Sequence, residues 1–278
     1  MTTLKIRNPF NAPVYYEETV ASTMDVSRQL ASGGEVHGTV ITAGFQESGR
    51  GRIRDRIWEM ERNVNLPFTV LLRYPRIEEI PAALTLRIGL AVSLAIEDFA
   101  PSLQGKIEVK WPNDIMIDSK KAVGILCEAD DGNVYAGIGI NFAQKEFPAH
   151  LREKATSIVL AAGRDIAQDE RFYLLEKILV RLYVELESQH ALPQTGEGYH
   201  IGAEGGGKDW RARLEQRLYK KNEQVVFMEG AACSGKTVNG RLAGIGGGGE
   251  LLIVPDGENE ALPFISGELV FLTADRSA

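Results

Sequence analysis

The sequence predicts an α+β protein: a mixed or antiparallel β-sheet flanked by helices, followed by a small C-terminal SH3-like β-barrel. Three observations predict it. Short strand-like segments separated by turns, together with three helical segments, occupy the chain up to residue 195. A glycine-rich stretch follows, and from residue 218 short apolar segments alternate with turns without a helical period. We therefore expect a large domain over 1–195, a glycine-rich connection over 196–217 and the small barrel over 218–278.

The composition limits which ligands the protein can bind and in which compartment it can work. The 278 residues are 44% hydrophobic and 25% charged, with a net charge of -7. This acidic balance argues against bulk capture of nucleic acid or anionic lipid, so an anionic ligand must meet a local basic cluster. Cys127 and Cys233 lie far apart beside apolar or small residues, which fits reduced thiols in a cytoplasmic protein, and no metal-type His/Cys spacing occurs. The apolar run at 82–95 contains Arg87 and is shorter than the roughly 20 residues that span a bilayer, so we expect a core helix and no membrane partner.

The first domain alternates strands with helices. After a strand at 14–20, we expect Ser22 to cap a helix, with Asp25 as its capping-box partner, and the helix to end near 33–34. Further strands are expected at 38–46, 65–73, 106–111, 115–118, 122–129 and 133–142, with helices at 81–100 and 170–188. In the last helix, apolar residues recur at helical spacing: Phe172, Leu175, Leu179, Leu182 and Leu186.

The C-terminal part contains GAACSGKT at 230–237, which satisfies the phosphate-binding pattern G-x-x-x-x-G-K-[ST]. Such a loop needs a helix directly after it, because the loop amides and the helix N-terminus together hold the phosphates. Here TVNGRLAGIGGGG follows, with β-branched residues, an Asn-Gly turn and repeated glycines, and a G-x-G-x-x-G at 244, 246 and 249 fails the same test. We interpret the region as strands and turns of the barrel, and we do not expect Lys236 to contact nucleotide.

One polar loop gathers positive charge in this acidic chain. ESGRGRIRDRIW places arginines at 50, 52, 54 and 56, and glycines at 49 and 51 let backbone amides approach a ligand. The loop suits an anion. The alternative is a solvated basic loop, or a weak RNA contact through its RGR element.

Two further segments carry polar groups beside strands. KWPND at 110–114 joins a strand ending in lysine to a rigid turn, and Lys120 and Lys121 follow on the next hairpin. GIGIN at 137–141 is a strand whose glycines leave room for a flat or bulky ligand and whose Asn141 supplies an amide. A surface β-turn and close strand packing are the structural alternatives for the two segments.

Together, FQESGRGRIRDRIW, KWPNDIMIDSKKAVGILCE and GIGIN occur in the order typical of the biotin protein ligases, and the chain resembles this family over roughly residues 14–271. The resemblance implies a class II synthetase-like biotin/lipoate ligase catalytic domain. It also implies the reaction: ATP activates biotin to biotinyl-5'-AMP, and the biotinyl group passes to a lysine on the biotin carboxyl carrier domain of a carboxylase. ATP and Mg²⁺ are then the cofactors, and biotin is a substrate.

The resemblance implies a role for each matching residue. Lys121 is the chief catalytic group at the α-phosphate, Lys120 is a surface lysine, and Arg52, Arg56 and Lys110 support the phosphates. The biotin-binding residues are Ser22, Thr23, Gln46, Gly49, Arg50, Gly51, Trp58 and Gly124, with helix capping as the alternative for Ser22. The ATP- and adenylate-binding residues are Arg52, Arg56, Asn113, Lys121 and Asn141. Asp114 either helps to hold magnesium or only braces its turn.

The chain departs from the family pattern at four places. GRGRIRDRIW is one residue longer than the usual loop and lacks its inner glycine, so Arg54 is an alternative to Arg56 as a phosphate ligand. EMERNVN after Trp58 lacks the usual serine-proline and glycine, and Met24 stands where asparagine is usual. GIGGGGELL replaces an acidic turn with four glycines, which predicts a more flexible hairpin.

Two alternatives accompany this interpretation. A lipoate/octanoate-type acyl ligase shares the fold but does not typically contain KWPND. A protein that retains biotin or biotinyl-AMP with little turnover is the second, because the arginine loop is altered.

Some family members carry an N-terminal DNA-binding domain, but only about 20 residues precede Ser22, so we expect a form without it and no DNA partner. Members often dimerise through sheet edges, and the sequence leaves monomer and homodimer both open.

Overall fold

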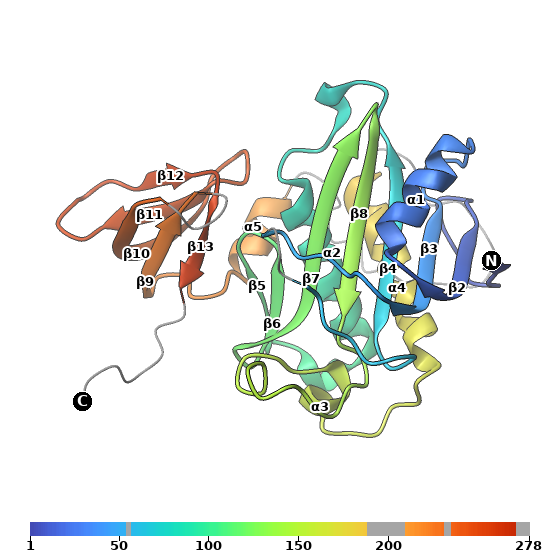
Figure 1. Cartoon of the computed structure of the whole chain (residues 1–278). Coiled ribbons are helices and arrows are strands. Elements are labelled where there is room, and N and C mark those ends of the chain that lie inside the picture. The colour runs from blue at the N-terminus through green and yellow to red at the C-terminus, as the bar shows by residue number, and fades with distance from the viewer. Residues whose placement is uncertain (54–56, 188–208, 231–234, 271–278) are drawn as a thin grey trace.

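In the computed structural model, which describes residues 1–53, 57–187, 209–230 and 235–270, the predicted α+β class is confirmed (Figure 1). The larger sheet consists of β1 (Thr2–Thr3), β2 (Val14–Val20), β3 (Val40–Gln46), β4 (Leu66–Arg73), β5 (Ile107–Lys110), β6 (Asp114–Ile117), β7 (Lys120–Asp130) and β8 (Asn133–Ile140). Their order is β1-β2-β3-β4-β8-β7-β6-β5. The sheet is mixed, because β2 and β3 run parallel whereas the other paired strands run antiparallel.

Helices cover both faces of the larger sheet. On one face, Met24 and Ala31 of the first helix pack against Leu71 of β4 and Tyr135 of β8. On the other face, Phe68 of β4 belongs to the main core, and side chains three apart on a strand point in opposite directions. The helices are α1 (Thr23–Ser32), α2 (Leu84–Phe99), α3 (Ile158–Ala162), α4 (Glu170–Leu186) and α5 (Trp210–Glu215), with 3₁₀ turns at Ile77–Glu79 and Pro101–Leu103.

The start of α1 differs in one respect from the expected capping box. Ser22 is the cap, and its hydroxyl oxygen accepts a hydrogen bond from the Met24 amide at 3.3 Å. Asp25 does not complete the box in the predicted way: its Oδ1 lies 2.6 Å from Nη2 of Arg50. An arginine distant in sequence competes for this carboxylate, and local spacing gives no sign of it.

The segment Ile77–Phe99 is long and apolar enough to cross a membrane by length and composition alone, and half of its most apolar window is buried. In the structure α2 is a core helix, as expected. Its Arg87 lies 3.0 Å from Glu185 of α4, with only 11% and 3% of the two side chains exposed. Glu185 also lies 2.5 Å from Arg213 of α5. This buried carboxylate ties three helices together, since a buried charge requires a partner.

The smaller sheet is antiparallel and consistent with the predicted SH3-like domain. Its strands, in the order β12-β11-β10-β9-β13, are β9 (Gln224–Glu229), β10 (Thr237–Ile245), β11 (Leu251–Pro255), β12 (Leu262–Phe264) and β13 (Gly267–Val270). Figure 1 shows these orange and red strands beside β5 and α5. Phe227 and Leu242 of the small sheet share one buried cluster with Leu90 of α2 and Val109 of β5, so the two sheets have a common core.

Trp111 is the central contact between the two sheets. Its side chain is 3% exposed, its ring lies 5.9 Å from that of Phe227, and its Nε1 donates to the Gly249 carbonyl at 3.0 Å. Beside it, the β5 edge is covered, because the amide of Val109 donates to the Arg217 carbonyl at 2.7 Å. The aromatic residue of KWPND therefore serves to dock the small sheet.

The region after GAACSGKT is a strand, as expected. β10 begins at Thr237, directly after Lys236, and no helix follows within the part of 230–245 that the structure describes; residues 231–234 lie outside it. The expected turn at Asn239 and Gly240 is wrong, because both residues lie inside β10 and pair with residues of β9, and Gly240 also pairs with β11. An added Cβ at Gly240 would lie 2.3 Å from the Val254 carbonyl, so glycine permits close strand contact here and makes no turn.

Helix α5 falls inside the stretch 196–217, for which we expected only a glycine-rich connection. Its Leu214 is fully buried in the core shared by the two sheets. Residues 196–208 lie outside the described residues. The domain boundaries at 195 and 218 remain predictions.

Replacing Gly249 with alanine should destabilise the protein by about 2 kcal/mol. Its φ is +96°, and an added Cβ would lie 2.7 Å from the Ala83 side chain. Gly247→Ala is the matched control in the same hairpin, since its added Cβ meets no described atom within 4 Å. Urea denaturation of both variants checks this, and equal stabilities would contradict the docking of the hairpin.

Candidate active site

A row of paired residues crosses the larger sheet and forms the floor of the candidate site. The ladder places Lys110 opposite Asp114, Asp114 opposite Gly124, Gly124 opposite Gly139, and Gly139 opposite Pro67. Directly paired residues of neighbouring strands have side chains on the same face. Two adjoining strands thus contribute glycines to a floor without side chains, beside the lysine and aspartate of KWPND.

A β-bulge brings Lys121 to this face. Asp114 pairs with Gly124 and Ile115 with Val123, but the register then shifts so that Met116 pairs with Lys121. A bulge re-aims a side chain in this way. Nζ of Lys121 consequently lies 2.6 Å from Oδ1 of Asp114, and an added Cβ at Gly124 would be 3.3 Å from the same ammonium nitrogen. The site therefore has a cation above the floor.

Segments distant in sequence cover the rest of the floor. An added Cβ at Gly139 would lie 2.8 Å from the ring of Trp58, and one at Gly137 would lie 3.0 Å from the sulfur of Met24. The glycines of GIGIN thus leave room for side chains of the protein itself. Trp58 and Gly124, both predicted at the biotin wall and floor, are brought to the same surface.

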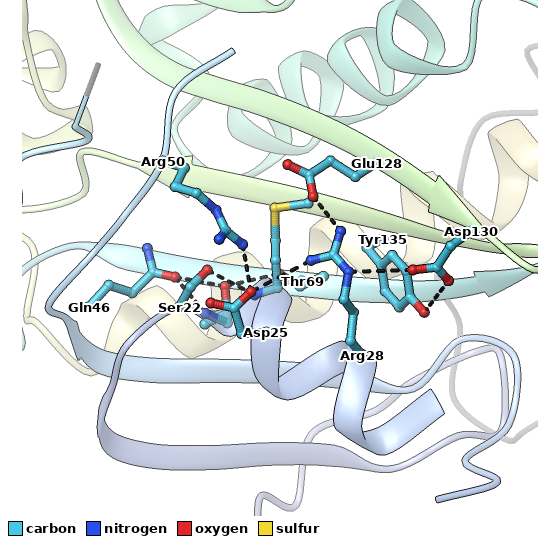
Figure 2. A network of polar contacts seen from close by, with 11 residues as sticks. Ser22, Asp25, Arg28, Gln46, Arg50, Thr69, Glu128, Asp130 and Tyr135 are labelled. Carbon is cyan, nitrogen blue, oxygen red and sulfur yellow. Dashed lines mark hydrogen bonds and ion pairs between the residues drawn. The ribbon is translucent and has the colours of Figure 1, made fainter. Parts of the chain in front are cut away.

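A hydrogen-bonded group lies at the α1 end of the floor (Figure 2). Oε1 of Gln46 accepts from the amide of Thr23 at 2.8 Å and from its hydroxyl at 2.9 Å. Thr69 of β4, a residue that we did not predict at the site from the sequence, donates to the Thr23 hydroxyl at 2.9 Å. A threonine inside the buried apolar strand LPFTVLLR was the available signal. Ser22 precedes Thr23 and is 3% exposed, so three predicted biotin residues come together.

The glycine-arginine hairpin, of which the structure describes residues 47–53 and 57–58, extends from β3. Its base is anchored where the amides of Glu47 and Ser48 donate to the Val20 and Ala21 carbonyls. The Trp58 amide donates to the Gly49 carbonyl at 2.9 Å, and an isolated bridge pairs Arg50 with Ile57. The half-buried Gly51 follows Arg50.

The described hairpin arginines diverge instead of meeting at one point. Arg50 reaches Asp25 of α1 at 2.6 Å (Figure 2), whereas Nη2 of Arg52 donates to the Gly267 carbonyl of β13 at 2.9 Å. Arg54 and Arg56 lie outside the described residues. The phosphate role expected of Arg52 and Arg56, with Arg54 as the alternative, therefore stays a prediction.

Both predicted adenylate asparagines brace strands. Nδ2 of Asn113 donates to the Ile125 carbonyl at 2.8 Å, and Nδ2 of Asn141 donates to the Thr156 carbonyl at 3.1 Å. Each amide nitrogen carries a second proton, and each amide oxygen has acceptor capacity for a ligand. Lys110 is buried at 3% exposure and lines a small cavity facing the second sheet. Its phosphate role remains a prediction.

The arrangement suits a long ligand with a neutral polar head and an anionic end. The Thr23–Gln46 group offers donors and acceptors at one end, Lys121 offers positive charge at the other, and the glycine floor joins them. Among the described residues, no group of three or more His, Cys, Asp or Glu side chains is arranged to hold a metal ion. A magnesium ion bound through Asp114 would need oxygens from the ligand.

Comparison with known proteins gives concordant matches. The model of the biotin/lipoate A/B protein ligase family matches residues 16–143. The bifunctional ligase/repressor BirA of Bacillus subtilis is 36% identical over 77% of this chain and 68% of its own length. The biotin--[acetyl-CoA-carboxylase] ligase of Mycobacterium tuberculosis is 29% identical over 66% of this chain and 67% of its own length. The biotin protein ligase of Aquifex aeolicus, solved with biotin and ATP, has a TM-score of 0.73 at 26% identity, covering 92% of this chain and 97% of that one.

Replacing Gly139 with alanine should displace the Trp58 ring and leave the sheet intact. The added methyl group would lie 2.8 Å from ring carbons, closer than contact distance. Acrylamide quenching of tryptophan fluorescence should increase, because Trp58 gains solvent contact. In a Trp58→Phe background, Gly139→Ala should leave the acrylamide quenching of the remaining tryptophans unchanged. A change in quenching in that background would contradict the placement of Trp58.

Proposed function

Because the chain belongs to the biotin/lipoate A/B protein ligase family and is a ligase, we propose that it activates biotin with ATP and attaches it to a protein lysine. The intermediate is biotinyl-5'-AMP, and the acceptor lies on the biotin carboxyl carrier domain of a carboxylase. The observation that carries the proposal is the glycine floor with Thr23 and Gln46 at one end and Lys121 at the other. A neutral ring and an anionic tail fit these two ends.

The polar end is assigned to the biotin ureido ring. That ring presents a carbonyl acceptor and two N–H donors, so its site needs both kinds of partner. Ser22, Thr23 and Gln46 provide hydroxyl and amide groups in a largely buried setting, where each satisfied hydrogen bond matters most. Backbone groups of Gly49, Arg50 and Gly51 close over the ring, with Trp58 as the apolar wall.

The cationic end is assigned to the reacting phosphate. The biotin carboxylate must approach the α-phosphate of ATP although both are negative, so positioned cations are required. The Lys121 ammonium has three protons, and the contact with Asp114 leaves others to reach phosphoryl oxygens. Arg52 joins it after leaving the Gly267 carbonyl, and Lys110 and Arg56 provide further positive charge.

Remaining features complete the proposal. Asn113 and Asn141 read the adenosine, and Mg²⁺ enters with the ATP phosphates and contacts Asp114. Transfer to the carrier lysine requires no covalent acyl-enzyme, so no side-chain nucleophile is assigned. We place the reaction in the cytoplasm, since Cys127 is a free thiol, as is usual in a reducing compartment. Cys233 lies outside the described residues.

The purified protein should exchange labelled pyrophosphate into ATP only when biotin is present. Exchange requires reversible adenylate formation, and transfer of biotin to a purified carrier domain should follow. Lipoate and octanoate serve as competing substrates. Absence of biotin-dependent exchange at saturating ATP and magnesium would rule the proposal out, and exchange without transfer would favour retention of biotinyl-AMP.

Lys121→Ala should lower biotin adenylation by about 10²- to 10³-fold, the range for removing one group that stabilises charge in a transition state. Lys120→Ala is the control, because it removes a neighbouring lysine that pairs with Ile117, a residue of the opposite, core-facing side. Circular dichroism should show both variants folded. Wild-type adenylation rates for Lys121→Ala would contradict its catalytic role and indicate that another cation stabilises the phosphate.

A further inference from the structure

Asp25 lies in the first turn of α1, two residues after Thr23, and faces two guanidinium groups. Its Oδ1 is 2.6 Å from Nη2 of Arg50 and 3.6 Å from Nη1 of Arg28. Figure 2 shows the carboxylate with Arg50 on one side and Arg28 on the other. Asp25 therefore joins the glycine-arginine hairpin to α1.

The Arg28 side of this contact is fixed to the larger sheet. Arg28 bonds to Glu128, lies 3.4 Å from Asp130, and stacks 4.8 Å from the ring centre of Tyr135. The Tyr135 hydroxyl donates to Asp130 at 2.7 Å. The hydrogen bond that Arg28 donates to the Glu128 carboxylate raises the pKa of Arg28, which stays charged. The network gives Asp25 a rigid setting.

The Arg50 side of the contact is coupled to Trp58. Arg50 is bridged to Ile57 across the base of the hairpin, and the Trp58 amide donates to the Gly49 carbonyl. The Trp58 ring in turn lies against Gly139 of the floor. Holding Arg50 at α1 therefore holds Trp58 over the site.

We propose that Asp25 is a positioning residue that keeps the glycine-arginine hairpin over the glycine floor through Arg50, before any ligand binds. The ion pair uses the Arg50 guanidinium, so this residue serves the site through its backbone. The kinetic consequence rests on the proposed biotin ligation. Because 44% and 41% of the two side chains are exposed, solvent and salt screen the pair, and the shift between closed and open hairpin is less than tenfold.

The test combines hydrogen–deuterium exchange with kinetics on Asp25→Asn. In the protein without substrates, amide exchange over residues 47–53 and 57–60 should speed up severalfold, because these residues separate from α1 and the floor more often. KM for biotin should rise severalfold while kcat stays near wild type, since saturating biotin closes the hairpin. Asp25→Glu should restore both, and high salt should bring the wild type toward Asp25→Asn.

Two controls separate positioning from general damage. Asp130→Asn makes the same chemical change in the same network without touching Arg50, and it should leave exchange over 47–53 and 57–60 unchanged. In an Arg50→Gln background, Asp25→Asn should add no further effect. Unchanged exchange in Asp25→Asn, or full effects in the Arg50→Gln background, would overturn the proposal. The exchange measurement needs no substrate, so it stands even where wild-type protein fails to activate biotin.

Discussion

The register between β6 and β7 is the constraint on which the candidate site depends. A strand that slips by one residue turns every side chain to the opposite face. Here the shift after Ile115 lets Ala122 and Val123, adjacent in sequence, both join the main core. The same shift frees Lys121 to face Asp114, while its backbone bonds to the segment 154–156 instead of a neighbouring strand of the sheet. The same β-bulge thus determines both the packing of Ala122 and Val123 in the core and the position of the Lys121 ammonium.

The segment KWPND divides its residues among three tasks. Asp114 pairs with Lys121, Asn113 bonds to Ile125 on the far side of the bulge, and Trp111 donates to Gly249 in the second sheet. A change at Trp111 therefore alters the docking of the small sheet, whose Gly267 holds Arg52 of the hairpin. The residues of KWPND therefore serve the packing of the two sheets as well as the candidate site. The four-glycine hairpin serves the same packing, since Gly249 packs against Ala83 at the start of α2.

The long strands and helices of the larger domain were predictable because each carries its own periodicity, whereas the short helices α3 and α5 were not expected. The glycines of GIGIN indicated room above the sheet, and in the structure Trp58 and Met24 lie over two of them. Partners distant along the chain were not predictable. Thr69 reaches Thr23 across 46 positions, and Arg52 reaches Gly267 across 215. Local rules also misread Asp25 as a capping residue, because its strongest partner comes from another loop. Only the strand register of the folded sheet shows which side chains meet, and this register cannot be derived from the periodicity of a single sequence.

The partners of the cations distinguish their tasks. Arg50 and Lys121 each contact a carboxylate, whereas Arg52 contacts a neutral backbone carbonyl. A guanidinium beside a carboxylate gains the attraction between two full charges, which a guanidinium beside a neutral carbonyl lacks. In the proposed reaction, an incoming phosphate would therefore displace the Gly267 carbonyl from Arg52 more easily than Asp25 from Arg50. Lys121 need not exchange its partner, because an ammonium has further protons. The hairpin can thus keep its attachment to α1 through Arg50 while Arg52 moves to the anion.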